Sequence, residues 1–141
     1  MRGLVVFAAI VAVSAAAAEE GVTGVSPDEI VWRANPLPGN KTAVLLGGVD
    51  KPGLYAFRAK LDKGALIPPH THPDTRMITV LSGELFAGSG AKFDETSGRL
   101  YPAGSFFVVP AGVAHFSWAK NGEVVYQEQG FGPTPTTFFK Q

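Results

Sequence analysis

The chain has 141 residues, and its 12 Lys and Arg residues balance its 12 Asp and Glu residues to a formal net charge of zero. This balance argues against a nucleic-acid-binding surface, because such a surface needs an excess of clustered Lys and Arg to displace the counterions of phosphate. The chain has no Cys, which excludes disulfides, thiolate metal sites and a catalytic thiol. Its length fits one domain, and any chemistry depends on His, carboxylate and amide side chains.

The first 18 residues have the pattern of a secretory signal peptide. Arg2 supplies an early positive charge, residues 4–13 are all apolar, and residues 14–18 are all small. A membrane-spanning helix is the alternative, but the apolar run is far shorter than the roughly 20 residues that cross a bilayer. We therefore predict cleavage after Ala18 and export to the periplasm or the extracellular space. The mature domain, 19–141, begins with a loose leader over 19–25 and is predicted to have no membrane association.

Ser26 opens a short predicted helix. Pro27 suits the first helical position, and Glu29 stands three residues after Ser26, as in a capping box. Asn35 precedes Pro36, and a residue before proline disfavours the helical region. We therefore predict a short N-terminal helix of about two turns at most.

From Thr42 onward the sequence has the pattern of an all-β protein. Short runs of Val, Leu, Phe and Tyr alternate with Gly, Pro, Asn and Asp, at the spacing of a sandwich or barrel. No stretch after residue 35 sustains a helical period, and the segment from Lys92 to Arg99 reads as a polar loop. The predicted strands cover residues 43–46, 54–61, 76–81, 84–87, 105–109, 115–119, 123–129 and 136–139.

The three histidines, His70, His72 and His115, are the candidate metal ligands. The first two stand at positions i and i+2, which point to the same face of a strand, so their imidazoles can reach one ion. His115 can complete the site from a neighbouring strand. From spacing alone, the alternative is a solvated His-x-His loop with an unrelated third histidine.

Two motifs with fixed spacing contain these histidines. Gly64-x5-His70-x-His72-x3-Arg76-x6-Gly83 resembles the first cupin motif, G-x5-H-x-H-x3-E-x6-G, at every position except one. Gly104-x5-Pro110-x-Gly112-x2-His115-x3-Ala119 resembles the second, G-x5-P-x-G-x2-H-x3-N, again at every position except one. The chain is thus similar to small single-domain cupins, in particular to a subgroup of short bacterial cupins without a settled activity.

The resemblance implies a conical, antiparallel jelly-roll barrel with a divalent metal ion held inside it by His70, His72 and His115. Closing the barrel removes sheet edges and encloses a cavity in which imidazoles compete well with water for the ion. Gly83 fits a tight hairpin turn between two predicted strands, and the turn at Pro110 and Gly112 leads to His115.

Arg76 stands where the first motif has its ligating glutamate, and Ala119 stands where the second has asparagine. Arginine stays charged in proteins, so Arg76 cannot replace the metal ligand. In one interpretation, the three histidines hold the ion and Arg76 lies inside the barrel as a clamp for a substrate anion. Three-histidine iron centres occur in some cupin-like dioxygenases, so the resemblance then implies an oxygenase of a small acid.

Two other interpretations of Arg76 remain open. In one, Asp74, Gln127 or Glu128 supplies a fourth ligand or lines the cavity. Gln127 and Glu128 point to opposite faces of their strand, and Gln127 is the preferred cavity residue. In the other, metal is absent or weakly held, Arg76 forms a salt bridge with Asp74 or Glu128, and the barrel is a binding module.

The leading hypothesis from the sequence is an exported, metal-binding cupin that acts on or binds a small anionic organic molecule. Fe(II) and Zn are the preferred metals, ahead of Mn, Ni and Cu, because imidazole accepts all of them. The alternatives are a non-catalytic ligand-binding or sensor protein and a zinc-dependent isomerase or lyase. A homodimer formed through an edge strand is expected of cupins.

Overall fold

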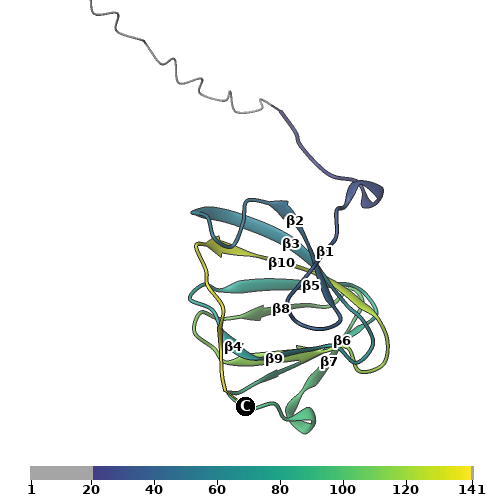
Figure 1. Ribbon diagram of the computed structural model, residues 1–141, viewed down its shortest axis with the longest axis vertical. Coiled ribbons are helices and arrows are strands. Elements are labelled where there is room, and N and C mark those ends of the chain that lie inside the picture. The colour runs from purple at the N-terminus through teal and green to yellow at the C-terminus, as the bar shows by residue number, and fades with distance from the viewer. Residues whose placement is uncertain (1–20, 141) are drawn as a thin grey trace, which may run out of the picture.

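Two antiparallel sheets face each other in the computed structural model, which describes residues 21–140 (Figure 1). The six-stranded sheet has the order β1 (Arg33–Ala34), β2 (Asn40–Leu46), β3 (Gly53–Leu61), β10 (Val124–Gly132), β5 (Arg76–Ser82) and β8 (Phe106–Val109). The five-stranded sheet has the order β11 (Thr137–Phe138), β4 (Leu66–Thr71), β9 (His115–Trp118), β6 (Glu84–Ser89) and β7 (Arg99–Pro102). This arrangement confirms the predicted all-β jelly roll.

The predicted N-terminal helix is wrong in type and length. Only one turn of 3-10 helix forms, η1 (Pro27–Glu29), and strand β1 begins at Arg33. The capping box is present, because the Ser26 backbone N–H donates to Glu29 Oε2 over 2.7 Å. The cap therefore forms, but the backbone is already extended at Ile30, and Arg33 pairs with Thr42 in the sheet, so the chain leaves the helix after one turn.

The predicted signal peptide, residues 1–18, lies outside the described residues. Within residues 21–140, no helix has the length and apolar character needed to cross a membrane.

All eight predicted strands overlap observed ones, but β1, β4 and β7 were not predicted. Strand β4 contains Pro68 and Pro69, and proline is unusual inside a strand because it has no backbone N–H to donate to the neighbouring strand. Its pairing with β9 indeed shifts register between Ile67 and His70, and then resumes with His70 opposite His115. Strand β7 follows the second 3-10 turn, η2 (Glu95–Ser97), at the end of the segment predicted to be a loop.

Strand alternation places the core between the two sheets. In β10 the buried residues Val124, Tyr126 and Glu128 alternate with half-buried Val125, Gln127 and Gln129. The other main contributors to the core come from β3, β5 and β6: Ala59, Leu61, Ile78, Val80 and Leu85. One face of each long strand thus lines the barrel interior.

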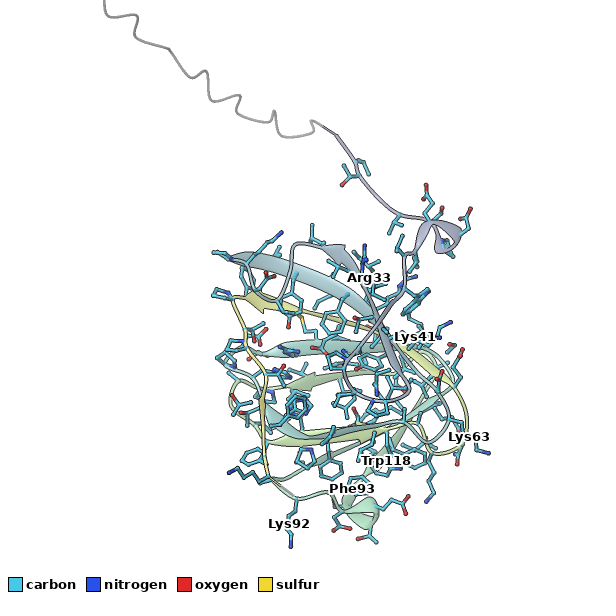
Figure 2. All side chains as sticks on the ribbon, viewed as in Figure 1. Arg33, Lys41, Lys63, Lys92, Phe93 and Trp118 are labelled. Carbon is cyan, nitrogen blue, oxygen red and sulfur yellow. The ribbon has the colours of Figure 1, made fainter. Side chains whose placement is uncertain are left out.

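The outer face of the five-stranded sheet is covered by the loop that contains η2. Phe93 packs edge-on against Phe116 and Trp118, with ring centroids 5.2 Å from each (Figure 2). Trp118 therefore points away from the barrel interior and packs against this covering layer, as its alternation with His115 predicts. His115 and Ser117 are left to face the interior.

Gly83 forms the predicted tight turn between β5 and β6, and we expect its replacement to be costly. A Cβ at this position would lie 2.2 Å from the Glu123 carbonyl oxygen, and the backbone φ of +75° disfavours any side chain. Gly83→Ala should lower the free energy of unfolding by roughly 1–3 kcal/mol, measured by urea denaturation. The matched control is Gly122→Ala, which would meet no heavy atom within 4 Å. An equal loss in both variants would contradict this prediction.

Candidate metal centre

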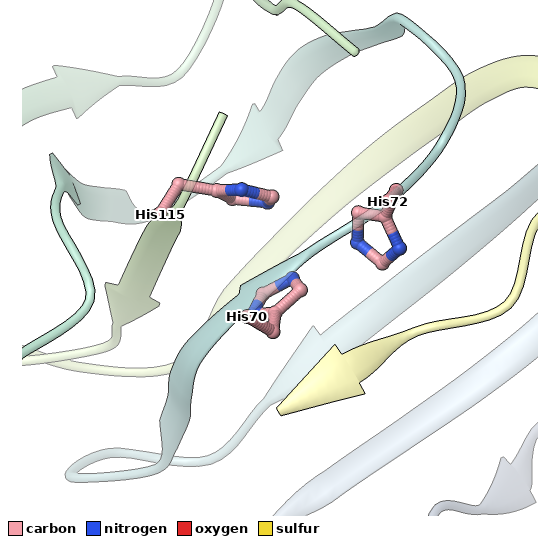
Figure 3. Close-up of side chains that lie close together, drawn as sticks. All are labelled: His70, His72 and His115. Atoms are coloured by element: carbon pink, nitrogen blue, oxygen red, sulfur yellow. The ribbon is translucent and has the colours of Figure 1, made fainter. Parts of the chain in front are cut away.

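Two strands of the five-stranded sheet bring the three histidines together. His70 on β4 lies directly opposite His115 on β9, and His72 follows one residue after the end of β4. The ring centroid of His70 lies 4.1 Å from that of His115 and 4.6 Å from that of His72. One nitrogen of each ring lies within 4.8 Å of the others, and the rings converge on one region of the interior (Figure 3). The predicted grouping of these histidines is therefore present in the fold.

Backbone carbonyl groups set the proton positions on two of the three rings. His70 Nδ1 donates to the Pro68 carbonyl oxygen over 2.7 Å, and His115 Nδ1 donates to the Val113 carbonyl oxygen over 2.9 Å. A proton on Nδ1 leaves Nε2 of both neutral rings with a free lone pair, which is what a metal ligand requires. His72 Nδ1 instead lies 3.3 Å from the Thr136 hydroxyl oxygen.

The interior of the barrel keeps these imidazoles neutral. Burial, followed by the charge that His115 would carry, lowers the pKa of His70 to about 4. Burial and the nearby Arg76 charge lower the pKa of His72 to about 3, and burial also lowers the pKa of His115. Three neutral imidazoles close together in an enclosed site are a suitable donor set for a first-row transition ion. The residues therefore fit the metal that the cupin motifs imply.

Arg76 is buried in a network of polar contacts beside the histidines. Its Nε donates to Asp74 Oδ1 over 3.2 Å, and its Nη1 donates to Glu128 Oε1. Its Nη2 donates to the Thr134 hydroxyl oxygen over 3.2 Å, and only 5% of the residue is exposed. The guanidinium thus makes the salt bridges with Asp74 and Glu128 that the third interpretation of Arg76 predicts.

Asp74 has the contacts of an ionised carboxylate. Burial opposes its ionisation, but hydrogen bonds from Thr134 and Tyr55 and the charge of Arg76 outweigh burial and lower its pKa. The Tyr55 hydroxyl donates to Asp74 Oδ2 over 2.9 Å. Burial, by contrast, raises the pKa of Glu128 despite the neighbouring guanidinium. Ionised Asp74 therefore balances the Arg76 charge whether or not Glu128 holds a proton.

The preferred cavity residue, Gln127, lies on the wrong face of β10. Its side chain accepts a hydrogen bond from Arg58 Nε over 3.2 Å on the outer face of the six-stranded sheet. Glu128 lines the interior instead, because the inward parity of β10 belongs to Tyr126 and Glu128. The sequence showed that Gln127 and Glu128 point to opposite faces of their strand. Which of them faces the interior is determined only by the pairing of β10 with β3 and β5.

Two threonines of the C-terminal segment contribute contacts that the sequence did not indicate. Thr134 is almost completely buried and bonds to both Arg76 and Asp74, and Thr136 contacts His72. Neither lies in a motif, and only the return of the chain along β4 as β11 brings them to the site.

Two cavities adjoin the network of Arg76 and the histidines. The inner cavity has a volume of about 120 Å³, and its lining includes His70, His115, Tyr126 and Glu128. The outer cavity, next to β2 and β3, has a volume of about 520 Å³, and its lining includes Arg76. The Arg76–Glu128 salt bridge therefore joins the wall of one cavity to the wall of the other.

Comparison with known proteins identifies the family. The model of the family described as "Cupin" matches residues 45–132, which is more than half of the chain. The chain belongs to the cupin family. Among curated proteins, this cupin is 40% identical over 83 residues to Germin-like protein 5-1 of Oryza sativa subsp. japonica, covering 55% of this chain and 35% of that protein. It is 36% identical over 70 residues to the Rhicadhesin receptor of Pisum sativum, covering 49% and 32% respectively. It thus spans less than half the length of these relatives.

Solved structures with the same fold include proteins of several different kinds. KdgF from Halomonas sp. matches with a TM-score of 0.63 at 23% identity, covering 77% of this chain and 94% of that one. The polyketide cyclase RemF from Streptomyces resistomycificus matches with a TM-score of 0.68 at 16% identity, covering 86% and 89%. An oxalate oxidase matches with a TM-score of 0.58 at 26% identity, covering 74% of this chain and 57% of that one. These likenesses establish the cupin fold, and they do not single out one reaction.

Removing the Arg76 guanidinium should destabilise the barrel strongly. Arg76→Met would leave the buried carboxyl groups of Asp74 and Glu128 without their cation, and breaking a buried ion pair on one side costs about 3–5 kcal/mol. We expect a loss of this size in the free energy of unfolding at pH 7. Arg58→Met is the matched control, because Arg58 is half-buried on the outer face and has a single glutamine partner. A loss in Arg76→Met no larger than in the control would contradict a structural role for this network.

The metal-free protein should lose stability as the pH falls from about 6.5 to about 4. Unfolded histidine titrates near pH 6.5, whereas folded His70 titrates at about 4 and folded His72 at about 3. Between these values the unfolded state takes up protons that the folded state does not, so acid favours unfolding. Urea denaturation across this range measures the slope. The His70→Gln/His72→Gln variant should have a flatter slope, and an unchanged slope would show that these histidines titrate normally.

Proposed function

We propose that this protein is a metal-dependent cupin that acts on, or binds, a small organic molecule. The observation that carries the proposal is the convergence of three neutral imidazoles, those of buried His70 and His72 and of half-buried His115, on one region of the barrel interior. Three protein ligands leave coordination positions open, as in catalytic rather than structural metal sites. A bound ion would supply Lewis-acid or redox chemistry there.

The metal is proposed to be Fe(II) or Zn, with Mn, Ni and Cu as the less favoured choices. An all-imidazole donor set accepts each of these ions, so occupancy depends on availability as well as on affinity. With Fe(II) the proposed reaction is oxygenation of a small organic acid; with Zn it is an isomerase or lyase reaction. If no turnover follows, the same site serves a binding or sensor protein.

The anion-binding group is proposed to be the metal rather than Arg76. The charge of the guanidinium is already balanced by Asp74, and its donors point to Asp74, Glu128 and Thr134. Three neutral imidazoles, by contrast, leave the full charge of a divalent ion uncompensated. An anionic oxygen of the ligand is therefore expected at the metal, and the clamp role of Arg76 stays a prediction that its contacts do not favour.

The cellular setting is a further part of the proposal. The signal-like sequence of residues 1–18 supports export, with the mature domain working in the periplasm or outside the cell. Pairing of two copies into a homodimer through an edge strand is proposed on the resemblance to cupins alone.

Elemental analysis of the protein purified without a histidine tag tests the metal site. We expect about one equivalent of a transition metal in the wild type, and a loss of at least tenfold in a His70→Ala/His72→Ala variant, since one imidazole cannot hold the ion. Glu95→Ala/Glu123→Ala is the control, because both glutamates are exposed and can bind metal only unspecifically. Equal metal contents in all three proteins, or none after reconstitution, would overturn the proposal.

The element that is found directs the next assay. An iron-loaded protein should consume dissolved oxygen with one member of a panel of small carboxylates and diketones. A zinc-loaded protein should not respond to oxygen, and its substrates are then sought by product analysis without it. Metal binding without any turnover would assign the barrel to the ligand-binding class.

A further inference from the structure

The outer cavity has apolar walls that solvent reaches. Val44 and Leu46 on β2 line it together with Tyr55 and Phe57 on β3. Val44 pairs with Phe57 across the two strands, so both side chains lie on the same face of the sheet. Yet Val44 is 67% exposed and Leu46 is 54% exposed. Apolar side chains that line a concave space and remain exposed to solvent indicate a site where an apolar ligand can bind by displacing water.

Charge in this cavity is balanced throughout. Asp50 and Lys51, of opposite sign, are the charged residues on its loop side. Arg76 is the charged residue at its deep end, and its guanidinium is paired with Asp74 and Glu128. An anionic ligand would therefore meet no unpaired positive charge in the outer cavity. The free-energy cost of removing its hydration water would not be offset by attraction to a cation.

The two cavities differ in what they can hold. Pockets that bind small molecules commonly have volumes of about 300–1,000 Å³. The inner cavity, at about 120 Å³, has room only for a small polar head group beside the histidines. The outer cavity, at about 520 Å³, has the size of a complete ligand body.

We propose that the outer cavity binds the uncharged, apolar body of a small molecule, aliphatic or aromatic, packed between Val44, Leu46 and Phe57. The inference goes beyond the proposed function and does not depend on the metal, because the Arg76–Glu128 salt bridge separates this cavity from the one that His70 and His115 line. The specificity of the protein comes from the apolar body rather than from an arginine clamp.

Binding of N-phenyl-1-naphthylamine, a neutral fluorescent probe, tests the apolar pocket. The wild type should bind it saturably, and both Val44→Asp and Val44→Trp should weaken binding at least tenfold, the first by adding a charge and the second by filling the space. The high exposure of Val44 makes both variants compatible with folding, which circular dichroism checks. Val31→Asp is the matched control, because Val31 is 66% exposed, about as much as Val44, and lines neither cavity.

Three outcomes would overturn the proposal. The first is an absence of saturable binding to the wild type, or binding that Val31→Asp weakens as much as Val44→Asp does. The second is tighter binding of the anionic probe 1-anilinonaphthalene-8-sulfonate than of the neutral one, which would indicate an anion site. The third is a change of oligomeric state in Val44→Asp, measured by light scattering, which would make this surface an interface between two copies.

The His70→Ala/His72→Ala variant separates this proposal from the metal site. Neither histidine lines the outer cavity, so the variant should bind the neutral probe as the wild type does. If the protein binds no metal, the probe result still stands; if it binds metal but not the probe, only the apolar pocket fails.

Discussion

The buried charge of Arg76 is the constraint on which the interior of this barrel depends. A guanidinium that is 5% exposed requires carboxylate partners, and Asp74 and Glu128 supply them from the residues before β5 and from β10. The same network ties down the C-terminal segment, because Thr134 bonds to both Arg76 and Asp74. The charged group thus joins two neighbouring strands of one sheet to the segment that crosses to the other.

This network reverses the sign of one charge relative to the cupin motif. The motif has a carboxylate at position 76, whereas here the carboxylate comes from Glu128 on the adjacent strand, next to Ile78. Glu128 is occupied by the guanidinium, and among the described residues only the three histidines form a close group of potential ligands. A metal ion held by these histidines would have no protein carboxylate among its ligands, so the negative charge that such an ion favours would have to come with the bound molecule.

Local spacing allowed the all-β class to be predicted, whereas the jelly-roll fold and the grouping of His115 with His70 and His72 were predicted from the resemblance to the cupin motifs. Gly83, Pro110 and Gly112 mark turns, and His70 and His72 share a strand face in any register. The side of β10 that faces inward was predicted wrongly, since the choice between Gln127 and Glu128 is made by pairing with β3, about 70 positions away in the chain. Thr134 and Thr136 were missed for the same reason, as their contacts span 58 to 64 positions.

The prolines of β4 weaken the backbone pairing between β4 and β9, the two strands that carry His70 and His115. Pro68 and Pro69 have no N–H groups, so the backbone ladder between β4 and β9 is interrupted immediately before His70 meets His115. In the metal-free protein this stretch is held by side chains more than by backbone hydrogen bonds, and its amide groups should open and exchange with solvent more readily than those of the β3–β10 pair. An ion bound by both His70 and His115 would cross-link β4 and β9 at this point. Slow amide exchange in β9 would then be a signal that the metal is bound.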